Sequence, residues 1–123
     1  MIPIAGALVE FDQTVSVNAG SGTVLFPPAQ IKVRGTGTVL TLDLVITVGD
    51  GFTEENAILM NSNAHLVIPD GRTLILNPPM TEYGFNNFPG ASNASITIDT
   101  LATVNIILAE RGISLQNSSF IFT

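Results

Sequence analysis

The 123-residue chain contains no cysteine and no tryptophan, and it carries little charge. Without cysteine there can be no disulfide, no thiolate metal ligand and no cysteine nucleophile. A single histidine, His65, excludes a histidine-rich metal site. Charged residues make up 11% of the chain, and ten acids against four Lys and Arg give a formal net charge of -6. We therefore do not expect nucleic acid as a partner, because phosphate binding needs a basic face.

Long hydrophobic segments are also absent from the sequence. The most apolar stretch, residues 39–48, is interrupted by Thr41, Asp43 and Thr47, so we expect no membrane-spanning segment. Residues 1–10 have neither the positive charge nor the long apolar run of a signal peptide. The sequence therefore predicts a soluble protein without a membrane partner.

The residue types that are abundant favour β-structure. Val, Ile and Thr account for 36 of the 123 residues, and their branched side chains fit strands better than helices. Apolar alternation recurs between turn signals at roughly ten-residue intervals, a spacing typical of small sandwiches and barrels. We expect one all-β domain over residues 1–123, either an antiparallel sandwich or a jelly-roll-like small barrel.

The clearest expected strand covers residues 38–48, where apolar and polar residues alternate. A period of two predicts that one face is buried and that Asp43 points away from the main core. The residues on the buried face are Leu40, Leu42, Leu44, Ile46 and Val48. Further strands are expected at residues 7–11, 14–18, 22–26, 30–34, 65–68, 72–76, 95–100, 103–110, 112–115 and 119–122.

Two shorter segments carry local signals. The Pro-Asp-Gly sequence at residues 69–71 stands between two apolar runs and predicts a hairpin or tight turn. Residues 53–60 fit one short helix, with Thr53 as its cap and two acids in its first turn. Residues 57–60 fit a strand equally well, and both alternatives stay open.

No residue pattern predicts an enzyme. The single histidine stands in an expected strand, and no Gly-x-Ser-x-Gly elbow accompanies it. Glycoside hydrolysis needs two carboxylates at a defined separation, and the sequence fixes none for its candidate acids. Those acids are Asp50, Glu54, Glu55, Glu82 and Asp99. We therefore expect a non-enzymatic protein without a cofactor.

Calcium is the ion that the sequence fits best. Carboxylate and amide oxygens gather at Asp50, Glu54, Glu55 and Asn56, and calcium prefers oxygen ligands. Their spacing does not match an EF-hand loop. A calcium ion near residues 50–56 therefore stays an open alternative to a simple cluster of charge at a helix start.

Scarce charge itself predicts association. Monomers usually place lysine and other charges on strand edges to prevent pairing between molecules, whereas this chain has a single lysine, Lys32. Its polar residues are mainly Thr, Ser and Asn, which suit contacts between subunits. We expect a homo-oligomer or a component of a larger assembly.

Two segments carry the expected partner contacts. Residues 77–94 form a long aperiodic loop with Tyr83, Phe85 and Phe88, and a loop facing only solvent would rarely carry three aromatic side chains. Residues 1–8 are apolar but too short for a core strand, so we expect an N-terminal arm that adds to a neighbour's sheet. The contact residues expected in this arm are Ile2, Pro3 and Ile4.

One segment resembles a different architecture. Residues 64–76, Ala-His-Leu-Val-Ile-Pro-Asp-Gly-Arg-Thr-Leu-Ile-Leu, look like a rung of a right-handed β-helix, as in pectate-lyase-like proteins. The resemblance covers about a tenth of the chain. We see no repeat of fixed period that carries it further, and repeat folds need several rungs and caps. The β-helix is therefore the alternative, and the sandwich is the expectation.

Over its whole length the chain resembles small virion structural proteins of tailed phages, with head decoration or cement proteins as the closest match. The likeness is one of size, composition and strand pattern, without a diagnostic motif. It implies a homo-oligomer, a trimer or a dimer with the trimer favoured, on the outer capsid surface that braces neighbouring capsid subunits through protein contacts. The alternative is a binding module that uses the 77–94 loop, such as a phage tail or receptor-binding domain, an adhesin or a carbohydrate-binding domain.

Overall fold

The computed structural model describes residues 8–18, 28–50, 56–107 and 111–123. Within these ranges the chain forms thirteen strands and no helix, so the expected all-β class is confirmed. Each strand pairs with its neighbours in parallel. The described part of the chain contains no helix that is long and apolar enough to cross a membrane.

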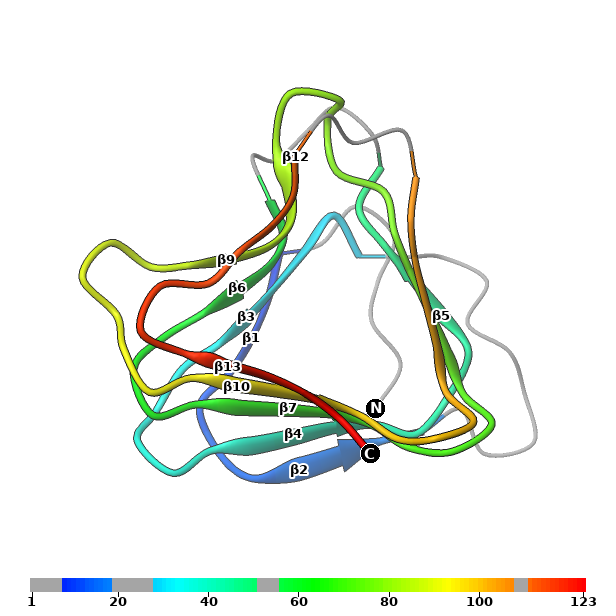
Figure 1. Cartoon of the computed structure of the whole chain (residues 1–123), viewed down its shortest axis with the longest axis horizontal. Helices are drawn as coiled ribbons and strands as arrows, with labels where there is room; N and C mark the ends of the chain where they lie inside the picture. Colours follow the sequence, from blue (N-terminus) through cyan, green and yellow to red (C-terminus); the bar gives the residue numbers. More distant parts are fainter. Residues whose placement is uncertain (1–7, 19–27, 51–55, 108–110) are drawn as a thin grey trace.

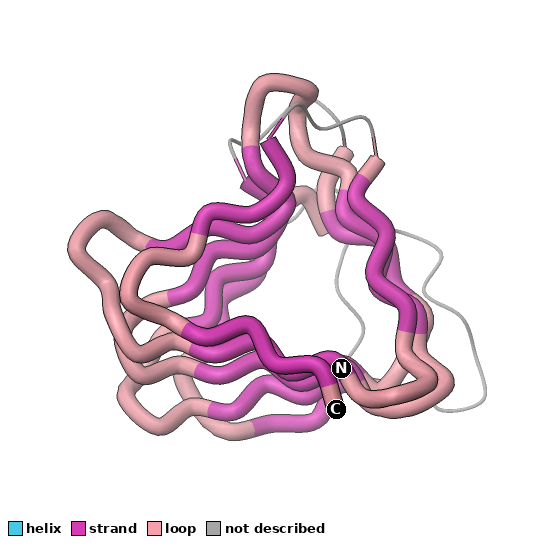
Figure 2. Tube along the Cα trace, viewed as in Figure 1, coloured by secondary structure: helices cyan, strands magenta, loops and turns pink. Residues whose placement is uncertain are grey.

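The strands form three sheets that enclose a triangular interior (Figures 1 and 2). Sheet A contains, in spatial order, β1 (Leu8–Phe11), β3 (Gln30–Val33), β6 (Asn56–Met60), β9 (Tyr83–Asn87) and β12 (Arg111–Ser114). Sheet B contains β2 (Val15–Val17), β4 (Val39–Leu42), β7 (His65–Ile68), β10 (Ser95–Ile98) and β13 (Ser119–Phe122). Sheet C contains β5 (Ile46–Val48), β8 (Thr73–Leu76) and β11 (Thr103–Ile106).

The chain passes through sheets A, B and C in turn and then begins the next coil on top of the last. This arrangement is a β-solenoid, and the expected antiparallel sandwich or jelly-roll barrel is wrong. The reason is physical. A strand with one buried face shows the same period of two whether its neighbours run parallel or antiparallel. The alternative that we drew from residues 64–76 therefore gives the architecture of the whole described chain.

Two expected connections are corrected by the corners of the solenoid. The strand expected over residues 38–48 is divided into β4 in sheet B and β5 in sheet C. The turn at residues 69–71 likewise joins β7 of sheet B to β8 of sheet C, so it is a corner and not a hairpin. The alternation of inward and outward side chains continues through the corner between β4 and β5, because Leu40, Leu44 and Val48 are all buried. The side of the chain that faces the interior was therefore predicted correctly, while its pairing was not.

Two further segments differ from expectation. Residues 56–60, where a helix or a strand was open, form strand β6. Residues 51–55 and the strand expected at 22–26 lie outside the described residues. The segment 77–94, expected as a loop, contains strand β9 of sheet A.

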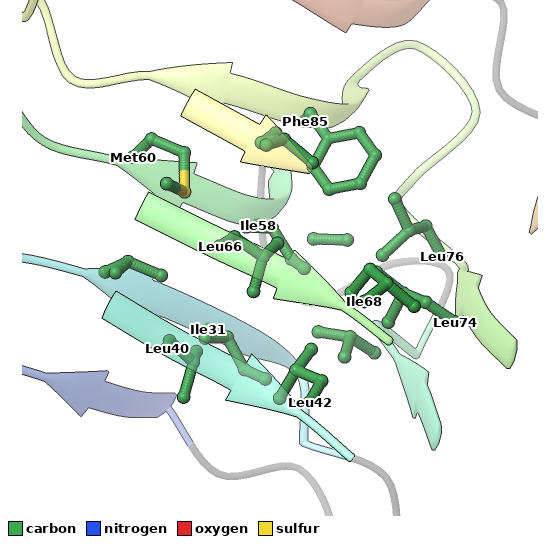
Figure 3. Packing of buried hydrophobic residues seen from close by; sticks show 14 of the residues in the cluster. Ile31, Leu40, Leu42, Ile58, Met60, Leu66, Ile68, Leu74, Leu76 and Phe85 are labelled. Atoms are coloured by element: carbon green, nitrogen blue, oxygen red, sulfur yellow. The ribbon is translucent and has the colours of Figure 1, made fainter. Parts of the chain in front are cut away.

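Stacked columns of apolar side chains form the core (Figure 3). Residues at equivalent positions in successive coils lie directly above one another, because the parallel strands are in register. In sheet A one column runs through Val9, Ile31, Ile58, Phe85 and Ile113. In sheet B another runs through Val15, Leu40, Leu66, Ile96 and Phe120. Full burial of each such side chain contributes about 1.5–3 kcal/mol.

A column of left-handed residues turns the chain from sheet A into sheet B. Gly37, Asn63, Asn93 and Asn117 all have positive φ, between 48° and 78°. Each lies two residues before the next strand of sheet B. Gly and Asn tolerate this conformation better than other residues. The same turn is therefore built at the same corner in four successive coils.

Candidate interaction surfaces

The predicted contact residues do not form one surface. Ile2, Pro3 and Ile4, with the rest of the expected arm 1–7, lie outside the described residues. Phe85 is fully buried in the core, where its ring packs against Phe120. Tyr83 and Phe88 are half-buried at opposite ends of β9. Simple alternation would put Tyr83 and Phe85 on the same face, but β9 departs from it, because Gly84 and Phe85 are buried in succession and Tyr83 lies beside Arg111.

Phe88 lies beside two basic side chains of sheet A and the connection after it, Lys32 and Arg34, in cation–π contact. The guanidinium carbon of Arg34 lies 5.1 Å from the Phe88 ring centroid, and the Lys32 ammonium lies 5.9 Å from it. Arg34 also pairs with Glu10 at 3.2 Å. At the other end of β9, Arg111 lies 5.7 Å from the Tyr83 ring. The two half-buried aromatic rings of the 77–94 segment, Tyr83 and Phe88, thus each lie close to cations of their own chain.

Formal charge is distributed unevenly over the three sheets. Sheet A carries Glu10, Lys32 and Arg111 on its strands. The strands of sheets B and C contain no Asp, Glu, Lys or Arg. The other charged residues of the described chain lie in the corners and connections, such as Asp43, which pairs with Arg72 at 2.8 Å. Two sides of the solenoid are therefore uncharged.

The outer face of sheet B consists mainly of hydroxyl-bearing and β-branched side chains, stacked in columns from strand to strand. Its central column contains Ser16, Thr41, Val67, Thr97 and Ile121. In the neighbouring column the ring of His65 lies 2.6 Å from the hydroxyl of Ser95. Sheet B has five strands, so the uncharged face extends over the full height of the described solenoid.

The outer face of sheet C has the same character. Thr73 pairs with Thr103, and Thr47, Ile75 and Asn105 form the next column. Val45, at the corner before β5, is an exposed hydrophobic residue. The described strands of sheets B and C therefore present two uncharged outer faces, and the corner between them carries Asp43, Asp70, Arg72 and Asp99.

Of the acids considered for catalysis or metal binding, Asp50, Glu82 and Asp99 lie in three different connections between strands. In the described chain no three His, Cys, Asp or Glu side chains gather into a group that could hold a metal ion. Asp70 accepts a hydrogen bond from the N–H of Leu101, and Asp99 accepts one from the hydroxyl of Thr123. In the segment considered for calcium, Asn56 is buried and its carbonyl oxygen accepts a hydrogen bond from Gln30. Glu54 and Glu55 lie outside the described residues.

Known proteins provide no further assignment. Comparisons of the chain with models of protein families, with curated proteins and with solved structures find no match. The argument for function therefore rests on the faces of the solenoid.

Proposed function

We propose that the protein is a non-enzymatic assembly protein that contacts other protein subunits through the outer faces of sheets B and C. The observation that carries this proposal is the absence of charge from every strand of these two sheets. The buried centre of a protein interface is depleted in charged residues. A sheet face exposed only to water has no such constraint.

The fold supports the proposal in a second way. The described coils are held in register by parallel pairing and by a continuous column core, so the outer faces are stiff and flat. A stiff face loses little conformational entropy when it docks. Thr and Val side chains, already limited in rotamer choice by branching, lose little more. Sheets B and C are therefore suited to extended contacts with protein.

The finer proposal is that the assembly is a tailed-phage capsid, on whose outer surface the protein stabilises the shell. It rests on the likeness in size and composition to head decoration proteins. Binding to an assembled shell and not to its free subunits would stabilise the shell by mass action. The competing proposal is a glycan- or receptor-binding module that uses Tyr83 and Phe88.

Solution mass and co-sedimentation distinguish these functions. We expect the chain to form oligomers or to sediment with intact shells and raise their thermal stability. A strictly monomeric protein that binds no shell would contradict the assembly function. Binding of soluble glycans by such a monomer would support the module instead.

A further inference from the structure

The two ends of the described solenoid differ in how well their inward residues are covered. In the first coil Phe11 is 5% exposed and Val17 is 1% exposed. In the last coil Ile113 is 48% exposed and Phe122 is 73% exposed. Phe122 stands two residues after Phe120 just as Val17 stands two residues after Val15, so both belong to the inward side of sheet B. Among the described coils, the last therefore has the more exposed inward side chains, although Val9 and Val15 of the first coil are also only partly buried.

Strand β13 is the edge of sheet B at the C-terminal end. The N–H groups of Ser119 and Thr123 donate to the carbonyl oxygens of Ala94 and Ile98, at 2.9 and 3.1 Å. Backbone polar groups alternate in direction along a strand. Those of Phe120 and Phe122 consequently point away from β10, toward the free edge. Two donors and two acceptors stand there beside two aromatic side chains.

We propose that a second copy of this chain covers the C-terminal end, with β13 pairing antiparallel to β13 of the second copy about a two-fold axis at Ile121. In this register Phe120 of one copy lies opposite Phe122 of the other as a hydrogen-bonded pair. Each such pair exchanges two N–H···O bonds. Paired residues of antiparallel strands share a face, so the four phenylalanines meet inside one continuous core.

The low charge of this end is the reason to assign it to a second copy. A two-fold contact brings the same surface of both copies together, so any cluster of like charge would repel itself. Residues 111–123 contain one charged residue, Arg111, which lies over the Tyr83 ring. The same rotation brings β12 of one copy to β11 of the other. The exposed Ile113 then faces the half-buried Val104 and Ile106 of the second copy.

A two-fold contact uses the same end of both copies, so it predicts a closed dimer and not a filament. A heterologous contact between two different ends would add copies without limit. At the opposite end Phe11 and Val17 are buried, and Val9 and Val15 are partly buried. This dimer goes beyond the assembly function, because it joins the copies through the edge of β13 and its inward phenylalanines, whereas the assembly contacts use the outer faces of sheets B and C; Ile121 lies on that outer face at the dimer axis.

Disulfide trapping tests the register directly, since the chain has no cysteine of its own. Ile121 lies on the two-fold axis as a non-hydrogen-bonded pair, where Cα atoms are about 4.5 Å apart, a separation that a disulfide can span. Ile121→Cys should form a covalent dimer about tenfold faster or more than Met80→Cys, because pairing raises the effective thiol concentration. Met80 is a matched control, an exposed hydrophobic residue far from β13.

Two outcomes would overturn the proposal. One is cross-linking of Ile121→Cys at the same rate as Met80→Cys. The other is a mass equal to one 12.9 kDa chain for the unsubstituted protein at high concentration. A second pair of variants does not depend on oxidation. Ile121→Lys and Ile121→Glu should each be monomeric by light scattering and should form a mixed dimer when combined, and failure of the mixture to associate would also exclude the two-fold axis at Ile121.

Discussion

The backbone N–H of Asn93 donates a hydrogen bond to the carbonyl oxygen of Asn117, 2.8 Å away, and both residues are left-handed, with φ of 58° and 48°. One level down, the N–H of Asn63 donates to the carbonyl oxygen of Ser92 at 3.0 Å, and below that the N–H of Gly37 donates to the carbonyl oxygen of Asn63 at 2.8 Å. At the corner between sheets A and B, the turns of successive coils are thus joined by backbone hydrogen bonds. The stability of this corner depends on residues that accept positive φ.

Replacing Asn93 tests this dependence. Asn93→Val should lower the free energy of unfolding by about 1–2 kcal/mol, because a branched side chain clashes in the left-handed conformation. Asn93→Gly should change it much less. Urea unfolding followed by circular dichroism measures both. Equal effects of Val and Gly would show that φ at this position is not the constraint.

The buried amide of Asn87 should contribute through its hydrogen bonds. It occupies an inward column after Phe11, Val33 and Met60. Its Nδ2 donates to the carbonyl oxygen of Gln116 at 3.2 Å and to the hydroxyl of Ser118 at 3.1 Å. Asn87→Ala should lower the free energy of unfolding by about 1–3 kcal/mol, since the carbonyl oxygen of Gln116 and the hydroxyl of Ser118 lose a donor in a partly buried site.

Amide exchange in residues 115–119 provides the readout specific to Asn87. Exchange there should accelerate in Asn87→Ala, while exchange in β4 stays slow. Unchanged exchange near Gln116 would indicate that the amide only fills space.

The turn at Gly71 should respond to substitution through its backbone alone. Its φ is +75°, and a Cβ added there would meet nothing within 4 Å. Gly71→Val should therefore destabilise the protein by about 1–2 kcal/mol through conformational strain, and Gly71→Asn by less. Thermal unfolding measures the difference. Equal melting temperatures of the Val and Asn variants would argue against the left-handed turn.

Neighbouring residues of β7 should show the inward and outward sides of the solenoid. Leu66 is fully buried, whereas Val67 faces outward and is half-buried. Leu66→Ala should cost about 2–5 kcal/mol, the range for buried leucines, and Val67→Ala should cost much less. Urea unfolding of the two variants measures both losses in the free energy of unfolding, and the loss should be larger for Leu66→Ala. A larger loss at Val67 would place the core on the other face of sheet B.

The sequence predicted the inward side of each strand better than the partner of each strand. Alternation at Leu40, Leu44 and Val48 marked the buried face correctly, because burial alone sets that pattern. It carried no information on strand direction. A fixed period would have revealed the solenoid, but Ile31 pairs with Ile58 after 27 residues and Ile96 with Phe120 after 24. Coils of unequal length therefore concealed the repeat.

One local signal was present and could have been used. Ser-Asn-Ala occurs at residues 62–64 and again at 92–94, followed each time by alternating apolar residues. These two segments are successive coils, with Leu66 above Ile96 and Leu74 above Val104 at an offset of 30 residues. A search for repeated turns, and not for repeated strands, would have aligned them.

The sequence was a poorer guide to where the side chains of the predicted contact residues would lie. Three aromatics in an aperiodic segment predicted a loop, yet Phe85 belongs to an inward column and Phe88 lies against Lys32 and Arg34. Aromatic side chains serve a core and an interface equally well. The scarcity of charge was the more useful signal, since the structure shows which sides of the solenoid lack it.

The most direct test of the central claim is the effect of one charge on the outer face of sheet B. Thr97 lies in the central column of that face, whereas Thr36 lies in an exposed turn after β3. Association with partner subunits or shells, measured by sedimentation, should weaken about tenfold or more in Thr97→Lys, because an unpaired charge is costly in an interface. Thr36→Lys should associate like the unsubstituted protein. Equal association of both variants would contradict the assignment of sheet B as a protein-binding face.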